Sequence, residues 1–176
     1  MHIRTLSASD VSRYRELMLE AYAVAADAFT TTAEERALEP ESWWVKRIAD
    51  PKGFGASFGA IDAGRLVGTA AIEYSAKPKL KHVALIIGMY VRPSARGKGL
   101  GKALLDAAMS HASQRQGVEV VTLTVTEGNA PAIGLYRNAG FQVWGIQPMA
   151  IATPSGYKGR VHMWCTLADG SRGSAA

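Results

Sequence analysis

The spacing of apolar residues changes along the chain and predicts alternating helices and strands. From Val11 to Ala25, apolar side chains recur at helical spacing and make one face. The apolar run from His82 to Val91 is typical of a buried strand. Glu119 to Thr126 alternates apolar residues with threonines and is rich in β-branched side chains, which favours a second strand.

Capping and turn residues predict the limits of the other elements. Ser7 and Asp10 form a capping-box-like start for the first helix, and Pro40 suits the first turn of the next, which runs through Ile48. Asn129 caps a short helix that ends before Gly140. The remaining predicted elements are strands at 2–6, 57–61, 66–74, 141–146 and 160–167, a helix from about 101 that ends near 117, a loop or weak helical turn at 27–39, and a loop at 148–159. Two strand–helix units in the second half predict an α/β fold in which the strands flanking the central helix pair in parallel.

Length and composition are typical of one folded domain. The chain has 176 residues, of which 48% are hydrophobic and 20% charged, so it can bury a sizeable core. We expect a single domain at 1–168 and a flexible tail at 169–176. No apolar run approaches the ~20 residues that span a bilayer, and the N-terminus lacks the apolar core of a signal peptide. A single cysteine, Cys165, excludes an intrachain disulfide and favours the cytoplasm.

The basic residues indicate one focused anion site. The net charge is +5, and the basic residues are scattered except between Arg92 and Lys102, where Arg96 and Lys98 add further mobile positive charge. The glycine-rich stretch 96–101 leads straight from a strand into a helix, so its amides and the helix dipole favour a phosphate group. No aromatic and basic platform for nucleic acid is visible, and no partner of that kind is expected.

Two other glycine-rich motifs fit this stretch poorly. Gly97, Gly99 and Gly101 lack the spacing of a dinucleotide fingerprint, and about ninety residues precede them. The Gly-Lys-Ser/Thr end of a P-loop is also absent.

Two motifs together carry a family resemblance. Arg96, Gly99 and Gly101 match the signature Arg or Gln, two residues, Gly, one residue, Gly or Ala. The second motif comprises Asn129, Ala132, Leu135-Tyr136 and Gly140-Phe141. In both motifs and in element order, the chain resembles the GNAT superfamily of acyl-CoA-dependent N-acetyltransferases. The resemblance implies a three-layer fold with a mixed, mostly antiparallel sheet of about seven strands, a central splayed parallel pair and about four helices.

The resemblance also implies acetyl-CoA as co-substrate and a primary amine as acceptor. The pantetheine arm is expected to pair with Met89, Tyr90 and Val91 in the gap between the splayed strands. The cofactor-binding residues implied in addition are Arg96, Gly97, Lys98, Gly99, Leu100, Gly101, Lys102, Asn129, Ala132 and Tyr136.

The implied chemistry is direct attack of the amine on the thioester in a ternary complex. Tyr136 matches the family's general acid toward the leaving sulfur, although it could instead simply pack in its helix. No acid lies between His82 and Arg92, where many relatives carry a glutamate base. His82 is therefore the first candidate base and Glu73 the second, followed by Glu127; water relaying to solvent is a further alternative.

The acceptor and the partners remain open at this stage. The acceptor could be a small molecule or a protein N-terminus or lysine, bordered by the first two helices, the segment between them, and the loop at 147–159 with Tyr157. A non-catalytic acyl-CoA-binding sensor is the alternative function. A homodimer is left open, and neither a membrane nor a metal partner is expected, because His2, His111 and His162 lack metal-ligand spacing with Cys165.

Overall fold

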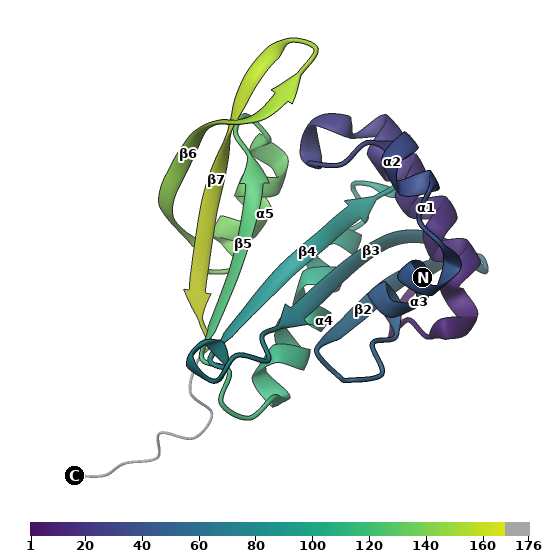
Figure 1. Ribbon diagram of the computed structural model, residues 1–176, viewed down its shortest axis with the longest axis horizontal. Coiled ribbons are helices and arrows are strands. Elements are labelled where there is room, and N and C mark those ends of the chain that lie inside the picture. Colours follow the sequence, from purple (N-terminus) through teal and green to yellow (C-terminus); the bar gives the residue numbers. More distant parts are fainter. Residues whose placement is uncertain (168–176) are drawn as a thin grey trace.

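The computed structural model describes residues 1–167 as a mixed sheet between two layers of helices (Figure 1). The strands are β1 His2–Thr5, β2 Gly55–Asp62, β3 Arg65–Tyr74, β4 Val83–Val91, β5 Val120–Thr126, β6 Gln142–Thr153 and β7 Gly156–Thr166. The α-helices are α1 Val11–Val24, α2 Ala33–Ala37, α3 Glu41–Ile48, α4 Leu100–Gln114 and α5 Ala130–Asn138. The seven strands lie in the order β1-β2-β3-β4-β5-β7-β6. The predicted three-layer α/β fold is confirmed, and the tail at 169–176 lies outside the described residues.

Two hydrophobic cores form, one on each face of the sheet. Leu104 and Leu105 of α4 are fully buried against β2, β3 and β4 on one face, where Tyr136 of α5 also packs. On the other face Leu17 of α1 and Trp44 of α3 lie in a separate buried cluster. α1, α3 and α4 therefore cover the sheet with the apolar stripes that their sequence periods predict.

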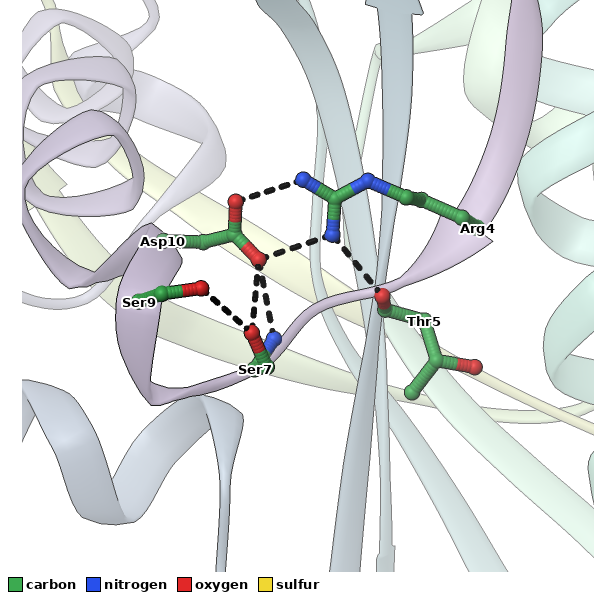
Figure 2. Close-up of polar contacts among 5 residues, drawn as sticks. All are labelled: Arg4, Thr5, Ser7, Ser9 and Asp10. Carbon is green, nitrogen blue, oxygen red and sulfur yellow. Dashed lines mark hydrogen bonds and ion pairs between the residues drawn. The ribbon is translucent and has the colours of Figure 1, made fainter.

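The start of α1 is fixed by the predicted capping box (Figure 2). The Asp10 carboxylate accepts hydrogen bonds from the backbone N–H of Ser7 at 2.9 Å and from the Ser7 hydroxyl at 3.2 Å. Arg4 of β1 donates to both oxygens of the same carboxylate, at 2.6 and 2.8 Å. This guanidinium holds the pKa of Asp10 well below its usual range, and the pair ties the first strand to the first helix.

The predicted loop at 148–159 is wrong, because most of it belongs to a long β6–β7 hairpin. Thr153 pairs with Gly156 across a two-residue turn, and the strands continue on both sides of it. Pro148 has no N–H to give to a ladder, yet it fits because β6 is the edge strand and its register is irregular between Gln147 and Ile151. The irregularity absorbs extra residues on β6, including one at positive φ, so a proline does not end the strand.

The only parallel pair in the described sheet is β4 with β5, as predicted, and it is short. Only Val83 to Leu85 of β4 pair with Val120 to Thr122 of β5. Beyond these three pairs the two strands separate toward their C-terminal ends, leaving the opening seen between β4 and β5 in Figure 1.

Candidate active site

A cavity of about 270 Å³ lies where β4 and β5 have separated; we call it the gap cavity. β4 contributes Ile86 to Met89, and β5 contributes Thr124 to Thr126. The remaining lining residues are Tyr22, Ala28, Phe29, Thr30, Thr31, Arg36, Arg47, Asn129, Ala132, Tyr136, Ile151 and Arg160. α1, α3 and the segment between them, which includes α2, thus border the cavity. The sequence predicted this for its first two helices from their position in the chain.

A β-bulge in β4 shapes one wall of the gap cavity. Thr69 of β3 pairs with Tyr90, while Ala71 pairs with Ile87, so two β4 residues, Gly88 and Met89, oppose a single residue of β3. Gly88 adopts φ +59°, a conformation that glycine reaches without a Cβ penalty. A bulge leaves its extra residue out of the ladder, so backbone polar groups at this point are available to a ligand in the cavity.

The opposite wall carries the second motif. The Asn129 side chain accepts a hydrogen bond from the backbone N–H of Ala132 at 3.3 Å and thereby caps α5. The Tyr136 hydroxyl, on the same helix, donates to the sulfur of Met89 on β4 at 3.4 Å. Burial raises the pKa of Tyr136 to about 12, so the hydroxyl keeps its proton at neutral pH.

The glycine-rich loop forms an open, exposed cradle before α4. Gly97 and Gly99 both have φ +75°, and a Cβ built on either would meet no heavy atom within 4 Å. Lys98 and Lys102 are exposed, and their ion pairs are with Asp62 at 4.0 Å and Asp106 at 2.6 Å. Because the first amides of a helix have no partner within it, this cradle fits a phosphate group.

The cradle does not include every residue of the basic segment. Arg92 is not mobile as expected: it is 7% exposed and forms ion pairs with Glu16 at 2.8 Å and Glu20 at 2.9 Å. The side chains of Tyr90 and Leu100 are also buried, Tyr90 in the core under α1 and Leu100 in the core under α4. Only their backbone groups remain for a ligand.

The three candidate bases lie outside the gap cavity. His82 is exposed just before β4, at the end where β4 and β5 are still paired, and so is separated from the cavity by the paired residues 83–85. Glu73 lines a neighbouring groove under α3 and forms an ion pair with Arg47. Glu127 lines another hollow beside Lys158. No aspartate, glutamate or histidine of residues 1–167 lines the gap cavity.

Sequence reasoning missed the arginines of the site. Arg36 comes from α2, Arg47 from α3 and Arg160 from β7, and no motif joins these positions in the sequence. Ile151 of the β6–β7 hairpin also lines the cavity, whereas Tyr157 is exposed and does not. Gly88 had a readable signal, since glycine inside a strand often marks a bulge.

Three further features concern a cysteine nucleophile, a metal site and a membrane-spanning helix. Cys165 is buried on β7, and burial raises its pKa to about 11, so its nucleophilic thiolate form is scarce at neutral pH. Within residues 1–167, no three His, Cys, Asp or Glu side chains are grouped to bind a metal ion. None of the helices in the described part of the chain is long and apolar enough to cross a membrane.

Comparison with known proteins gives one family. The model of the acetyltransferase (GNAT) family matches residues 15–141. A mycothiol acetyltransferase of Salinispora arenicola is 35% identical over 115 residues, which are 65% of this chain and 35% of that protein. The L-amino acid N-acetyltransferase AaaT of Escherichia coli is 32% identical over 102 residues, which are 58% of this chain and 62% of that protein.

A solved structure agrees on the fold. YncA of Salmonella typhimurium, a putative acetyltransferase solved with acetyl-CoA, superimposes with a TM-score of 0.79 at 22% identity and covers 100% of this chain and 99% of that one. The chain spans about a third of the length of the mycothiol acetyltransferases that it matches.

Proposed function

The chain belongs to the GNAT family of acetyltransferases, and we propose that it transfers the acetyl group of acetyl-CoA to a primary amine. The observation that carries this proposal is the gap cavity itself. The Gly88 bulge on β4 and the Tyr136 hydroxyl on α5 face this cavity from opposite sides, across strands that pair over only three residues.

The residues implied for the cofactor fit acetyl-CoA as co-substrate. We propose that the backbone of Met89 to Val91 pairs with the pantetheine amides in the place of a neighbouring strand. The amides from Arg96 to Gly101 would hold the pyrophosphate, assisted by the exposed Lys98 and Lys102. The open space at Gly97 and Gly99 supports this placement, because nothing there blocks a phosphate oxygen.

The cavity residues support direct attack by the amine. The amine nitrogen forms the new bond to the thioester carbonyl carbon while the carbon–sulfur bond breaks. A backbone N–H at the Gly88–Met89 bulge stabilises the developing oxyanion, and Tyr136 donates its hydrogen bond to the leaving sulfur. Tyr136 passes its hydroxyl proton to the sulfur, which ends as a thiol. The amine loses one proton to water, and water returns a proton to Tyr136.

Water is the proton acceptor that we propose. Neither His82 nor Glu73 lines the gap cavity, and the described lining contains no other carboxylate or imidazole. The amine therefore enters the attack as its neutral form, in equilibrium with solvent protons.

The exposed edge of the sheet supports a homodimer, which we propose as the assembly. β6 is an edge strand, and Trp144 and Ile146 on it are 64% and 52% exposed. An unpaired edge with large apolar side chains favours association with a second copy. We keep the cytoplasm as the proposed location, on the single cysteine of the chain.

Thiol release from acetyl-CoA, measured over a panel of amines, tests the transfer. For Tyr136→Phe we expect kcat to fall about 100-fold, within the range for loss of an acid group, while acetyl-CoA affinity changes less than about threefold. Tyr157→Phe, at an exposed tyrosine, is the matched control and should keep its kcat. Tight acetyl-CoA binding without turnover on any amine would instead favour a non-catalytic acyl-CoA sensor.

A further inference from the structure

The gap cavity has an unbalanced charge. Arg36, Arg47 and Arg160 line it, and no carboxylate among the described residues does. The rest of the lining is apolar or neutral, including Phe29 and Val125. Three guanidinium groups stay charged at any pH relevant to the protein, so the cavity has a positive potential where the acceptor must bind.

Arg36 lacks an acceptor for one of its nitrogens. Its Nη2 donates to the Thr31 hydroxyl at 3.1 Å, its Nη1 forms an ion pair with Glu39 at 3.4 Å, and its Cζ lies 4.4 Å from the centre of the Trp43 ring. The Nε atom is buried without any hydrogen-bond partner. A buried donor left unpaired destabilises the free protein, so the protein itself does not use the full hydrogen-bonding capacity of Arg36.

The three arginines differ in how far they are neutralised. Arg47 forms a 2.6 Å ion pair with Glu73, so much of its charge is balanced within the protein. Arg160 of β7 forms no ion pair with any of residues 1–167. Arg36 forms a longer ion pair with Glu39, at 3.4 Å, so its charge is only partly balanced and Arg160 holds the fully uncompensated charge. Arg36 and Arg160 come from α2 and β7, elements that flank the open end of the gap (Figure 1).

We propose that the acceptor carries a carboxylate next to its amine, and that Arg36 and Arg160 bind this carboxylate. This inference rests on the proposed acetyl transfer, because it assigns the acceptor of that same site. Guanidinium groups match carboxylates in shape and charge, and the interaction is strong where water is largely excluded. The apolar part of the lining then contacts the rest of the acceptor molecule, which is uncharged.

The same charges exclude other amines. A polyamine or a lysine side chain in a basic peptide would bring positive charge toward these arginines, and repulsion between like charges disfavours binding. The anchored carboxylate also restricts the position of the neighbouring amine, which favours attack at the Gly88 bulge.

Three matched amines test the proposal: L-methionine, L-methioninamide and 3-(methylsulfanyl)propylamine, with spermidine as a cationic comparison. We expect kcat/KM for L-methionine to exceed that of the amide and of the decarboxylated amine by about 100-fold, as for a lost charged contact. Arg160→Gln should raise KM for L-methionine about tenfold or more with little change in kcat, and Arg36→Gln should act in the same direction. Arg65→Gln, at an exposed arginine of the β2–β3 turn, should leave both constants unchanged.

Equal or faster acetylation of the decarboxylated amine or of spermidine would overturn the carboxylate assignment. Binding measurements separate this failure from failure of the transfer itself. L-methionine binding to the enzyme–CoA complex, measured by calorimetry, should weaken in Arg160→Gln even if no turnover occurs. If L-methionine does not bind that complex at all, or binds both proteins equally, the carboxylate site is refuted regardless of turnover.

Discussion

The guanidinium Nη1 of Arg47 lies 2.6 Å from Oε1 of Glu73, joining α3 to β3 beside the gap cavity. The pair gives Glu73 a partner of its own and faces it into the groove under α3 rather than the gap cavity. It also reduces the positive charge that Arg47 presents to the cavity. We therefore expect Glu73 to affect the site through the charge of Arg47 and not as a general base.

Glu73→Gln should consequently leave catalysis nearly intact. We expect kcat to change less than about fivefold, whereas loss of a general base lowers it by roughly 10²–10⁴. Since a partly exposed ion pair contributes about 0.2–1 kcal/mol, its loss should lower KM for a carboxylate acceptor by at most about fivefold. Steady-state kinetics with L-methionine measures both effects. A 100-fold drop in kcat would restore Glu73 as the base.

The pH dependence of kcat/KM should follow the pKa of the acceptor amine and not that of a group on the enzyme. With no titrating base in the described cavity lining, kcat/KM should rise about tenfold per pH unit up to the pKa of the acceptor amine, because only the neutral amine attacks. The pKa of Tyr136, about 12, predicts no falling limb below about pH 11. Profiles of two acceptors with different amine pKa values check this. One shared inflection between pH 6 and 7 would indicate a base on the protein instead.

A charge placed in the glycine cradle should weaken cofactor binding. Gly99→Asp brings a carboxylate toward the phosphates, and we expect acetyl-CoA affinity to fall more than about tenfold, or ~1.4 kcal/mol. Gly99→Asn is the matched control, since asparagine has nearly the same shape and tolerates the positive φ of this position. Calorimetric titration of both variants separates charge from strain. Equal affinities would remove the pyrophosphate from this loop.

Arg92 should contribute to the free energy of unfolding and not to acetyl-CoA binding. Arg92→Met breaks the ion pairs with Glu16 and Glu20 beneath α1, and we expect the free energy of unfolding to fall by about 1–3 kcal/mol. Acetyl-CoA affinity should stay within about threefold of the parent protein. Denaturant unfolding and calorimetry give the two numbers. Weaker binding without loss of stability would return Arg92 to the phosphate site.

The Arg4–Asp10 pair predicts a loss of stability in acid. The pKa of Asp10 is lowered in the folded state, so its contribution is complete above its unfolded pKa of about 3.9 and declines as pH falls toward the folded value. Asp10→Asn should lower the free energy of unfolding at pH 7 by about 1–3 kcal/mol. Below pH 4 the difference from the parent should shrink by about 1.4 kcal/mol per unit.

The fold was largely readable from the sequence, because its elements carry local signals. The capping box at Ser7 and Asp10, the helical apolar face of α1 and the glycines around α4 each act within a few residues. The sequence does not predict the β6–β7 hairpin, because a proline such as Pro148 ends a strand unless that strand lies at the edge of a sheet. Edge position is a property of the whole sheet, and the local sequence does not contain it.

The sequence predicted only the part of the candidate site that carries the two motifs. Met89, Asn129, Ala132 and Tyr136 all line the gap cavity. The arginines of the other half converge from three separate elements, and no spacing rule relates them. His82 illustrates the converse: its place at the start of a strand is nearly right, but the gap cavity lies toward the other end of that strand.

Because β4 and β5 pair over only three residues, the hydrogen bonding of the sheet is interrupted along the line between these two strands, which we call the seam. At the open end, the seam is bridged by a 2.6 Å hydrogen bond from the Thr126 hydroxyl to the Asp27 carbonyl and by the Lys158–Asp27 ion pair. A ligand that fills the seam with its own amides acts as an extra strand and adds cohesion between the two halves. At 100 times its dissociation constant, such a ligand contributes about 2.7 kcal/mol to the folded state, so the abundance of acetyl-CoA would influence how long the protein survives.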